Sequence, residues 1–264
     1  VNWRKIILGI MLFGALGAFF VSNACAVQIK RVQKGVANFD TDDVVQSVPI
    51  AAVDMDNSII LLQNTATSTT SNDQNWFFTA QFESTDTIAI DRAGATLPAS
   101  VIWQVVEFND GVSIQRGISS ITSPTKVKNI TLPVSLTNNG TTAVPIIQMR
   151  TALTTSTQAH EHFLVPNLTN NSTLRLDRGD ATGTKATQIV WQVVDFLTDT
   201  TVETNQTIMT TGSNITNQTV NVTLNTPASN PLFFMYFAGD TATNGIDSAL
   251  WVGGNFTSAT EVQF

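Results

Sequence analysis

The chain has 264 residues, of which only 12% are charged, and its formal net charge is −7. The few basic residues form no stripe, which excludes nucleic-acid binding as a function class. The single cysteine, Cys25, cannot form a disulfide framework within the chain. Uncharged hydroxyl and amide side chains, together with Val, Ile and Phe, are typical of half-buried β-strands.

Residues 1–26 have the three parts of a secretory signal. Two basic residues precede an apolar run at 6–21, and the small residues at 24–26 end in Ala-x-Ala, where cleavage is expected. The run is short of the ~20 residues that a membrane-spanning helix needs. An uncleaved anchor and a lipid-modified Cys25 are the alternatives. We expect a secreted, extracellular or cell-surface protein that meets the membrane only through this signal helix.

The remaining chain alternates apolar and polar residues over short stretches that are separated by turn residues, which predicts strands. No stretch after residue 27 has sustained helical periodicity. Both features favour an all-β fold of tandem immunoglobulin-like or jelly-roll-like β-sandwiches. In chain order, the expected strands lie at residues 44–50, 59–62, 76–78, 127–134, 173–176, 219–224 and 232–237.

An internal repeat divides the chain. The sequence Trp-Gln-Val-Val, followed by an acidic residue and Phe, occurs at residues 103–108 and again at 191–196. Upstream, the pattern of residues 87–92 returns at 173–178, in the same order along the chain. A duplicated structural unit accounts for both matches. The expected domains are a signal peptide at 1–26, repeats at 27–109 and 110–197, and an incomplete repeat at 198–264.

A third copy is visible in part, because residues 256–264 align without a gap with residues 82–90. Its Trp-containing strand would follow Phe264. One interpretation is a sandwich with an open edge, which a strand from another chain completes. The other is that the sequence is a fragment of a longer repeat protein. The starts of the first two units are expected to correspond at residues 29–32 and 114–117.

Each of the first two units contains one tryptophan in the repeated strand and one Asp-Arg pair in an earlier strand. Because neighbouring strand residues point to opposite faces, the Asp and Arg of a pair do not bond to each other. We expect the tryptophans to anchor the cores, and each Arg to bond loop carbonyls or the carboxylate of Glu107 or Asp195. Ligand stacking by the tryptophans and a shared binding role for the pairs are the alternatives. These repeat anchors are Trp103, Trp191, Asp91, Arg92, Asp177 and Arg178.

Candidate catalytic and metal-binding residues are few. His160 and His162 could share one face of a strand, but no third ligand is tied to them by spacing. No Gly-x-Ser-x-Gly elbow occurs. The aspartates at 40–43 and 54–56 suggest calcium, yet they lack the EF-hand spacing and do not recur, which favours solvated turns. We therefore expect no enzymatic activity, no catalytic residue, and no metal or cofactor.

Asn-x-Ser/Thr sequons are numerous, and all lie after residue 128. Several arise by chance in a chain so rich in Asn and Thr. In a source that N-glycosylates its proteins they would indicate a glycoprotein, and otherwise only a polar outer face. The sequons start at Asn129, Asn139, Asn167, Asn170, Asn171, Asn205, Asn214, Asn217, Asn221 and Asn255.

The segments at residues 114–117 and 103–108 resemble the tandem β-sandwich repeats of secreted bacterial surface and filament proteins. The resemblance covers most of residues 28–264 and carries no catalytic residues with it. We expect a structural or adhesive surface protein, with a filament subunit as one form, whose partners are copies of itself, other surface proteins or glycans. The alternative is a lectin-like carbohydrate-binding module, with Trp76, Trp251 and Tyr236 as the aromatic candidates.

Overall fold

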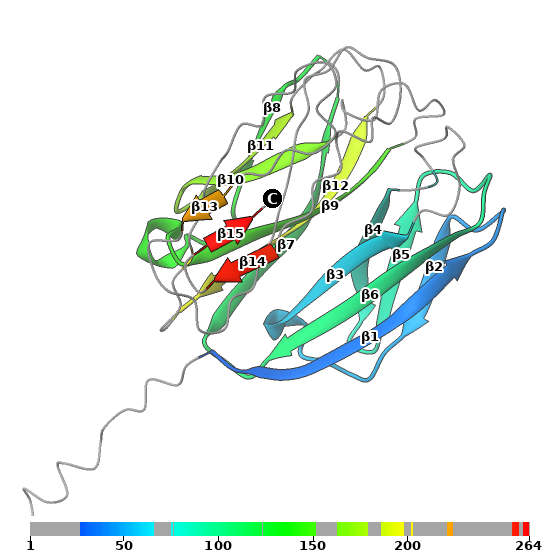
Figure 1. The fold of residues 1–264 in the computed structure, drawn as a ribbon, viewed down its shortest axis with the longest axis horizontal. Helices are drawn as coiled ribbons and strands as arrows, with labels where there is room; N and C mark the ends of the chain where they lie inside the picture. The colour runs from blue at the N-terminus through cyan, green and yellow to red at the C-terminus, as the bar shows by residue number, and fades with distance from the viewer. Residues whose placement is uncertain are drawn as a thin grey trace, which may run out of the picture.

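The chain is all-β wherever its structure is described (Figure 1). Apart from the strands, the short 3₁₀ turns η1 (Met55–Asn57) and η3 (Thr137–Gly140) occur in these parts of the chain. No helix among them has the length and apolar content that a membrane crossing needs. The signal predicted at 1–26 lies outside the described residues. The computed structural model describes residues 27–65, 75, 77–122, 124–151, 163–178, 186–197, 202, 221–223, 255–258 and 261–263.

The described strands form five antiparallel sheets of three strands each. Their orders are β1-β6-β3, β2-β5-β4, β7-β12-β9, β10-β11-β8 and β13-β15-β14. The strands are β1 (Ile29–Phe39), β2 (Val45–Pro49), β3 (Ser58–Thr65), β4 (Phe78–Ser84), β5 (Thr87–Arg92), β6 (Ala99–Phe108), β7 (Val112–Ile121), β8 (Val127–Thr131), β9 (Ala143–Thr151), β10 (Leu164–Asn170), β11 (Thr173–Arg178), β12 (Thr187–Phe196), β13 (Asn221–Thr223), β14 (Asn255–Ser258) and β15 (Glu261–Gln263).

The first two sheets enclose one core, and we call this pair the first body. Strand β5 shows how the sequence builds it, because its buried and half-buried residues alternate and place Ile88 and Ile90 inside. Opposite them, Trp103 of β6 enters the core from the other sheet. Phe39 and Phe78 also lie between the two sheets, with their ring centroids 5.1 Å apart. The result is a sandwich-like pair of layers.

The next two sheets form the second body in the same way. Strand β11 repeats the alternation of β5, and its Leu174 and Leu176 are completely buried. Trp191 of β12 enters the same core from the opposite sheet. In Figure 1 the first body, in blue to green, lies beside the second, in green to yellow.

The two bodies share their pairing registers as well as their strand orders. Gly35 lies opposite Trp103, and Gly117 lies opposite Trp191. Each glycine is required, because an added Cβ would lie 2.6 Å from Cζ2 of the tryptophan in both bodies. This register corrects the expected alignment of residues 29–32 with 114–117, since it matches residues 33–35 with 115–117 instead. The earlier match is therefore wrong by three residues.

A bulged hairpin occurs in the same register three times. In the first body Phe82 lies opposite Ile88, and the register shifts before Ser84 pairs with Thr87. Strands β10 and β11 repeat this with Leu168 and Leu174, followed by Asn170 and Thr173. Strands β14 and β15 repeat it with Phe256 and Val262, followed by Ser258 and Glu261. The hairpin and its bulge are thus a shared feature of the three units.

The chain enters and leaves each body at one end. The N–H of Asn109 donates to the carbonyl of Gln28 at 2.9 Å, and the N–H of Leu197 donates to the carbonyl of Gly111 at 2.9 Å. Gly111 has a φ of 74°, which lets the chain turn sharply from β6 into β7. The boundary expected between the units at residues 109 and 110 is therefore a tight turn.

Candidate functional site

The contact between the two bodies holds the most developed polar arrangement in the described structure. Strands β3 and β4 are the edges of their sheets, so one side of each lacks a neighbouring strand. These two edges lie against the outer face of the sheet β7-β12-β9. An open edge exposes N–H and C=O groups that need partners, and here side chains provide them.

Gln192 of β12 binds the edge strand β3 as another strand would. Its Oε1 accepts the N–H of Ile60 at 3.0 Å, and its Nε2 donates to the carbonyl of Ile60 at 2.8 Å. Gln192 is only 3% exposed. One amide therefore satisfies both backbone groups of a residue 132 positions earlier in the chain.

Gln148 of β9 joins both edge strands at once. Its Nε2 donates to the carbonyl of Ile60 at 2.9 Å, while its Oε1 accepts the N–H of Ala80 in β4 at 2.6 Å. Gln148 is 8% exposed, so these bonds are made away from water. We refer to the two side chains, Gln148 and Gln192, as the glutamine platform.

Arg116 of β7 extends the contact toward the turn η1. Its guanidinium donates to the carbonyls of Met55 and Ser58, the latter at 2.8 Å, and lies 5.3 Å from the ring centroid of Phe82. Burial lowers the pKa of this guanidinium, while the nearby carboxylates of Asp56 and Asp54 oppose the effect. Arg116 thus binds the first body at a third place, in addition to the two glutamines.

An apolar cluster closes the contact near the turn at residues 109–111. Ile59 and Val106 from the first body meet Ile146 and Val194 from the second. Phe108 and Phe196 pack edge to face, with centroids 6.3 Å apart. Apolar burial and backbone-directed amides together hold the two bodies in one orientation.

The first body carries the same residue types at the positions equivalent to the glutamine platform. Gln104 and Gln63 occupy the register positions of Gln192 and Gln148. Gln104 is half-buried and Gln63 is exposed. The outer face of the first body therefore has amide side chains at the positions that the second body uses to bind the edge strands. The exposed Val36 lies nearby on β1.

The docked edge itself is not repeated. The register places Pro145 at the position of Ile60, and Pro166 at the position of Ala80. Proline has no N–H, so neither position can donate to a glutamine oxygen as Ile60 and Ala80 do. The edge of the second body is thus chemically different from that of the first.

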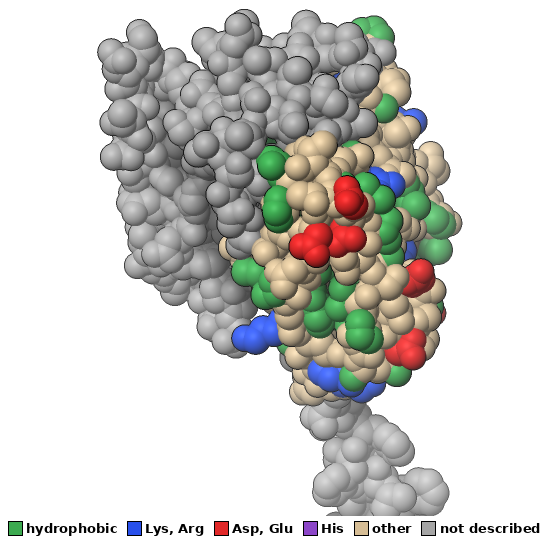
Figure 2. Space-filling model, turned by 90° about the vertical axis from the view of Figure 1, so that its right-hand side faces the viewer, with side chains coloured by type: hydrophobic (Ala, Val, Ile, Leu, Met, Phe, Trp, Pro, Cys, Tyr) green, Lys and Arg blue, Asp and Glu red, His purple; other side chains and the backbone are tan. Residues whose placement is uncertain are grey.

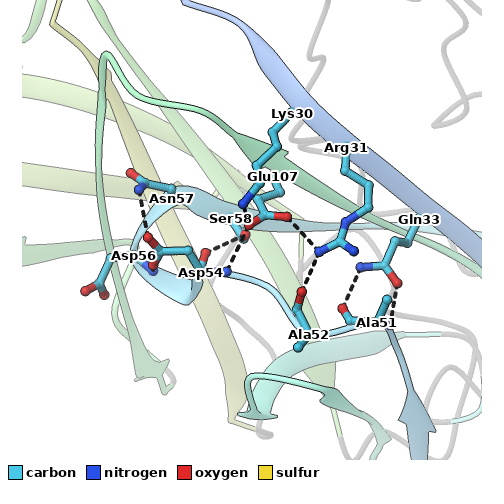
Figure 3. Close-up of polar contacts among 10 residues, drawn as sticks. All are labelled: Lys30, Arg31, Gln33, Ala51, Ala52, Asp54, Asp56, Asn57, Ser58 and Glu107. Carbon is cyan, nitrogen blue, oxygen red and sulfur yellow. Dashed lines mark hydrogen bonds and ion pairs between the residues drawn. The ribbon is translucent and has the colours of Figure 1, made fainter.

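A buried carboxylate fastens the turn η1 to the first body (Figure 3). Glu107, 1% exposed, accepts from Lys30 at 2.9 Å, from Arg31 at 2.8 Å, and from the N–H of Asp54 at 3.1 Å. Burial raises the pKa of Glu107, but the bonds from Lys30, Asp54 and Arg31 outweigh it and lower the pKa from 4.5 to about 2. The carboxylate of Glu107 therefore remains charged at neutral pH.

The equivalent carboxylate in the second body is Asp195, and it performs the same task with neutral partners. It accepts from the N–H of Thr137 at 2.7 Å, from the hydroxyl of Thr137 at 2.8 Å, and from the hydroxyl of Thr142 at 3.1 Å. In both bodies the acidic end of the Trp-containing strand therefore binds the 3₁₀ turn that precedes the next edge strand. These roles are structural.

The tryptophans of the repeated strands lie inside the bodies. Trp103 is 8% exposed and Trp191 is 5% exposed, and each ring covers a glycine of the neighbouring strand. Neither ring offers a surface on which a ligand could stack.

The arginines of the two Asp-Arg pairs are also internal. Arg92 is 1% exposed and donates to the carbonyls of Asp43, Leu97 and Asp40. Burial lowers the pKa of its guanidinium, opposed by the charge of Asp43. Arg178 donates to the carbonyl of Ile121 at 3.2 Å. The bonds of Arg92 go to loop carbonyls, and the expected alternative partner Glu107 is instead bonded to Lys30 and Arg31.

The aspartates of these pairs differ between the bodies. Asp91 lies 3.8 Å from Arg150 of the second body, and burial raises its pKa. Asp177 instead pairs with Arg175 on its own strand, at 2.7 Å. The positions correspond, but their partners do not, so the structure gives no common binding site for the two pairs.

A cavity of about 410 Å³ lies between the bodies, next to Asp91 and Arg150. Its cationic groups already have partners, since Arg92 bonds loop carbonyls and Arg150 bonds Gln188 and Asp91. Among the described residues no group of three acidic, His or Cys side chains could hold a metal ion. Asp43 and Asp54 bind neighbouring backbone N–H groups in their own turns.

Several candidates from the sequence lie outside the described residues. These are the histidines His160 and His162 and the aromatic candidates Trp76, Trp251 and Tyr236. The glutamine platform was not predicted from the sequence. Its one visible signal is the Gln that follows each repeated Trp, a polar residue between the apolar residues Trp and Val.

Comparison of the chain with protein-family models, with curated proteins and with solved structures finds no significant match.

Proposed function

We propose that this is a secreted, non-enzymatic surface protein with a structural or adhesive role. Its units at residues 27–109, 110–197 and 198–264 would be tandem β-sandwiches behind a cleaved signal at 1–26. The observation that carries the proposal is the contact between the bodies, in which the amides of Gln148 and Gln192 hold an open strand edge. Such a contact fixes one unit against the next and gives an array stiffness that a flexible linker would not.

The surface of the described residues supports the same proposal. On the described part of the face in Figure 2, hydrophobic side chains lie at many points and charged groups are few. Exposed valines, Val32, Val36, Val44 and Val45, lie on β1 and at the start of β2. Exposed apolar residues of this kind favour contacts with other proteins, including copies of the chain.

Negative-stain electron microscopy with light scattering on the purified protein tests the proposal. In its filament form, copies of the chain associate by strand addition, and ordered filaments or a ladder of discrete oligomers are expected. A monomer at all concentrations would refute the filament form and leave a monomeric adhesive array. Detection of the residues 1–26 on protein from the culture medium or cell surface would contradict cleavage of the signal.

A further inference from the structure

The sequons of this chain are more frequent than its composition predicts. From residue 129 onward there are 14 asparagines, and 10 of them have Ser or Thr two positions later with no intervening Pro. Ser and Thr make up 35 of these 136 residues, about a quarter, so about four matches are expected at random. The excess is therefore more than twofold.

Strand alternation does not explain the excess. A polar outer face places Asn and Thr two residues apart in either order, so it would enrich both directions equally. Ser or Thr stands two positions before only 4 of the same 14 asparagines, as chance predicts. Only the order that an N-glycosylation enzyme recognises is enriched.

The first body provides an internal control. Between residues 27 and 128 there are six asparagines, and none begins a sequon. On the sheet β2-β5-β4 the register positions of Asn129 and Asn167 are occupied by Ser47 and Gln81. The two bodies share their architecture, but only the second has sequons.

The structure brings several of these sequons to one face of the second body. Asn167 of β10 lies opposite Arg175 of β11, which lies opposite Asn129 of β8, so the three form one row across the sheet. Asn129 and Asn167 are both exposed, and so are the threonines Thr131 and Thr169 that complete their sequons. This row is on the face of the sheet away from the core.

Another sequon lies at the tip of the turn η3. Asn139 is exposed and has a φ of 55°, next to Gly140 with a φ of 80°. At the end of β10, Asn170 is also exposed, and its Oδ1 accepts from both the N–H and the hydroxyl of Ser172. A glycan at any of these asparagines would extend into solvent without displacing a core residue.

We infer that the outer face of the sheet β10-β11-β8 and the turn η3 are N-glycosylated, at Asn129, Asn139, Asn167 and one residue of the adjacent pair Asn170 and Asn171. The donor class is a sugar whose anomeric carbon is bonded to a lipid phosphate. The C1–O bond to the phosphate breaks and its electron pair leaves with the phosphate. A C1–Nδ2 bond forms, and the amide gives up one Nδ2 proton to a base, so no oxidant or reductant is needed.

This inference rests on the proposed export of the chain, because the transfer takes place outside the cytoplasm. Peptide mass spectrometry of the protein from its native source tests both points separately. We expect sugar masses on Asn129, Asn139 and Asn167, and none on Asn138, an exposed neighbour that begins no sequon. Unmodified sequons on a chain that starts at residue 27 would overturn the glycosylation and leave the proposed function intact. Unmodified sequons on a chain that retains residues 1–26 would overturn both.

Two matched variants expressed in the native source sharpen the test. Thr169→Ala destroys one sequon without changing Asn167, whereas Thr169→Ser preserves it. The sugar mass at Asn167 should disappear in the first variant and persist in the second, with Asn129 modified in both. Retention of the modification at Asn167 in Thr169→Ala would overturn the inference, because the modification would not depend on the sequon.

Discussion

The glutamine platform makes a quantitative prediction about the contact between the two bodies. Replacing Gln192 with Leu keeps the size of the side chain but removes its amide. The N–H of Ile60 then loses its only acceptor given by the structure, while the carbonyl of Ile60 keeps its bond from Gln148. A buried donor without a partner costs about 1–3 kcal/mol, and the second lost bond adds about 1 kcal/mol. We therefore expect a loss of about 2–4 kcal/mol in the free energy of unfolding.

The matched control is Gln104→Leu, which makes the same change at the equivalent position of the first body. The side chain of Gln104 is half-buried and has no hydrogen bond within the described structure, so this variant should change stability by less than about 0.5 kcal/mol. Urea unfolding followed by circular dichroism and tryptophan fluorescence measures both variants. Equal losses for Gln192→Leu and Gln104→Leu would refute the role given to the platform.

Two further predictions concern the interior of the first body. Gly35→Ala would place a Cβ 2.6 Å from the Trp103 ring, so thermal or urea unfolding should show a loss of about 1–3 kcal/mol, whereas Val36→Ala on the exposed side should be nearly neutral. Because the pKa of Glu107 falls to about 2 on folding, its contribution is complete above pH ~4.5 and is lost as the pH falls toward about 2. The full shift corresponds to about 3 kcal/mol, and exposure of the partner Lys30 reduces this to about 1–2 kcal/mol. In acid titrations of stability, Glu107→Gln should flatten the curve between these pH values, and an unchanged curve would contradict the assigned ion pairs.

Much of the fold follows from local patterns in the sequence. The strand expected at 44–50 is confirmed as β2, and the first part of that expected at 127–134 is confirmed as β8, which ends at Thr131, because alternation and turn residues define short strands well. The expected alignment of residues 29–32 with 114–117 is wrong because it matches Ile29 and Arg31 with Ile114 and Arg116, three residues out of the register of the strands. The informative residue was Gly117, which the ring of Trp191 requires to lack a side chain.

The candidate site could not be predicted in the same way. Gln192 acts on backbone groups of Ile60, and any residue type at position 60 except proline would offer the same groups. Sequence comparison between the units detects the glutamine but not its partner, since the partner has no side-chain signature. The two proline positions, 145 and 166, become meaningful only after the register shows which edge groups they replace.

The placement of the chain ends within each body has a mechanical consequence. Tension along the chain would reach the second body at Gly111 and at Leu197, which are joined by a hydrogen bond at one end of the neighbouring strands β7 and β12. Pulling there loads the hydrogen bonds between these antiparallel strands one after another and not all together. The second body would thus open at low force and lengthen, so that an anchored chain could yield to a sudden load before its attachment breaks.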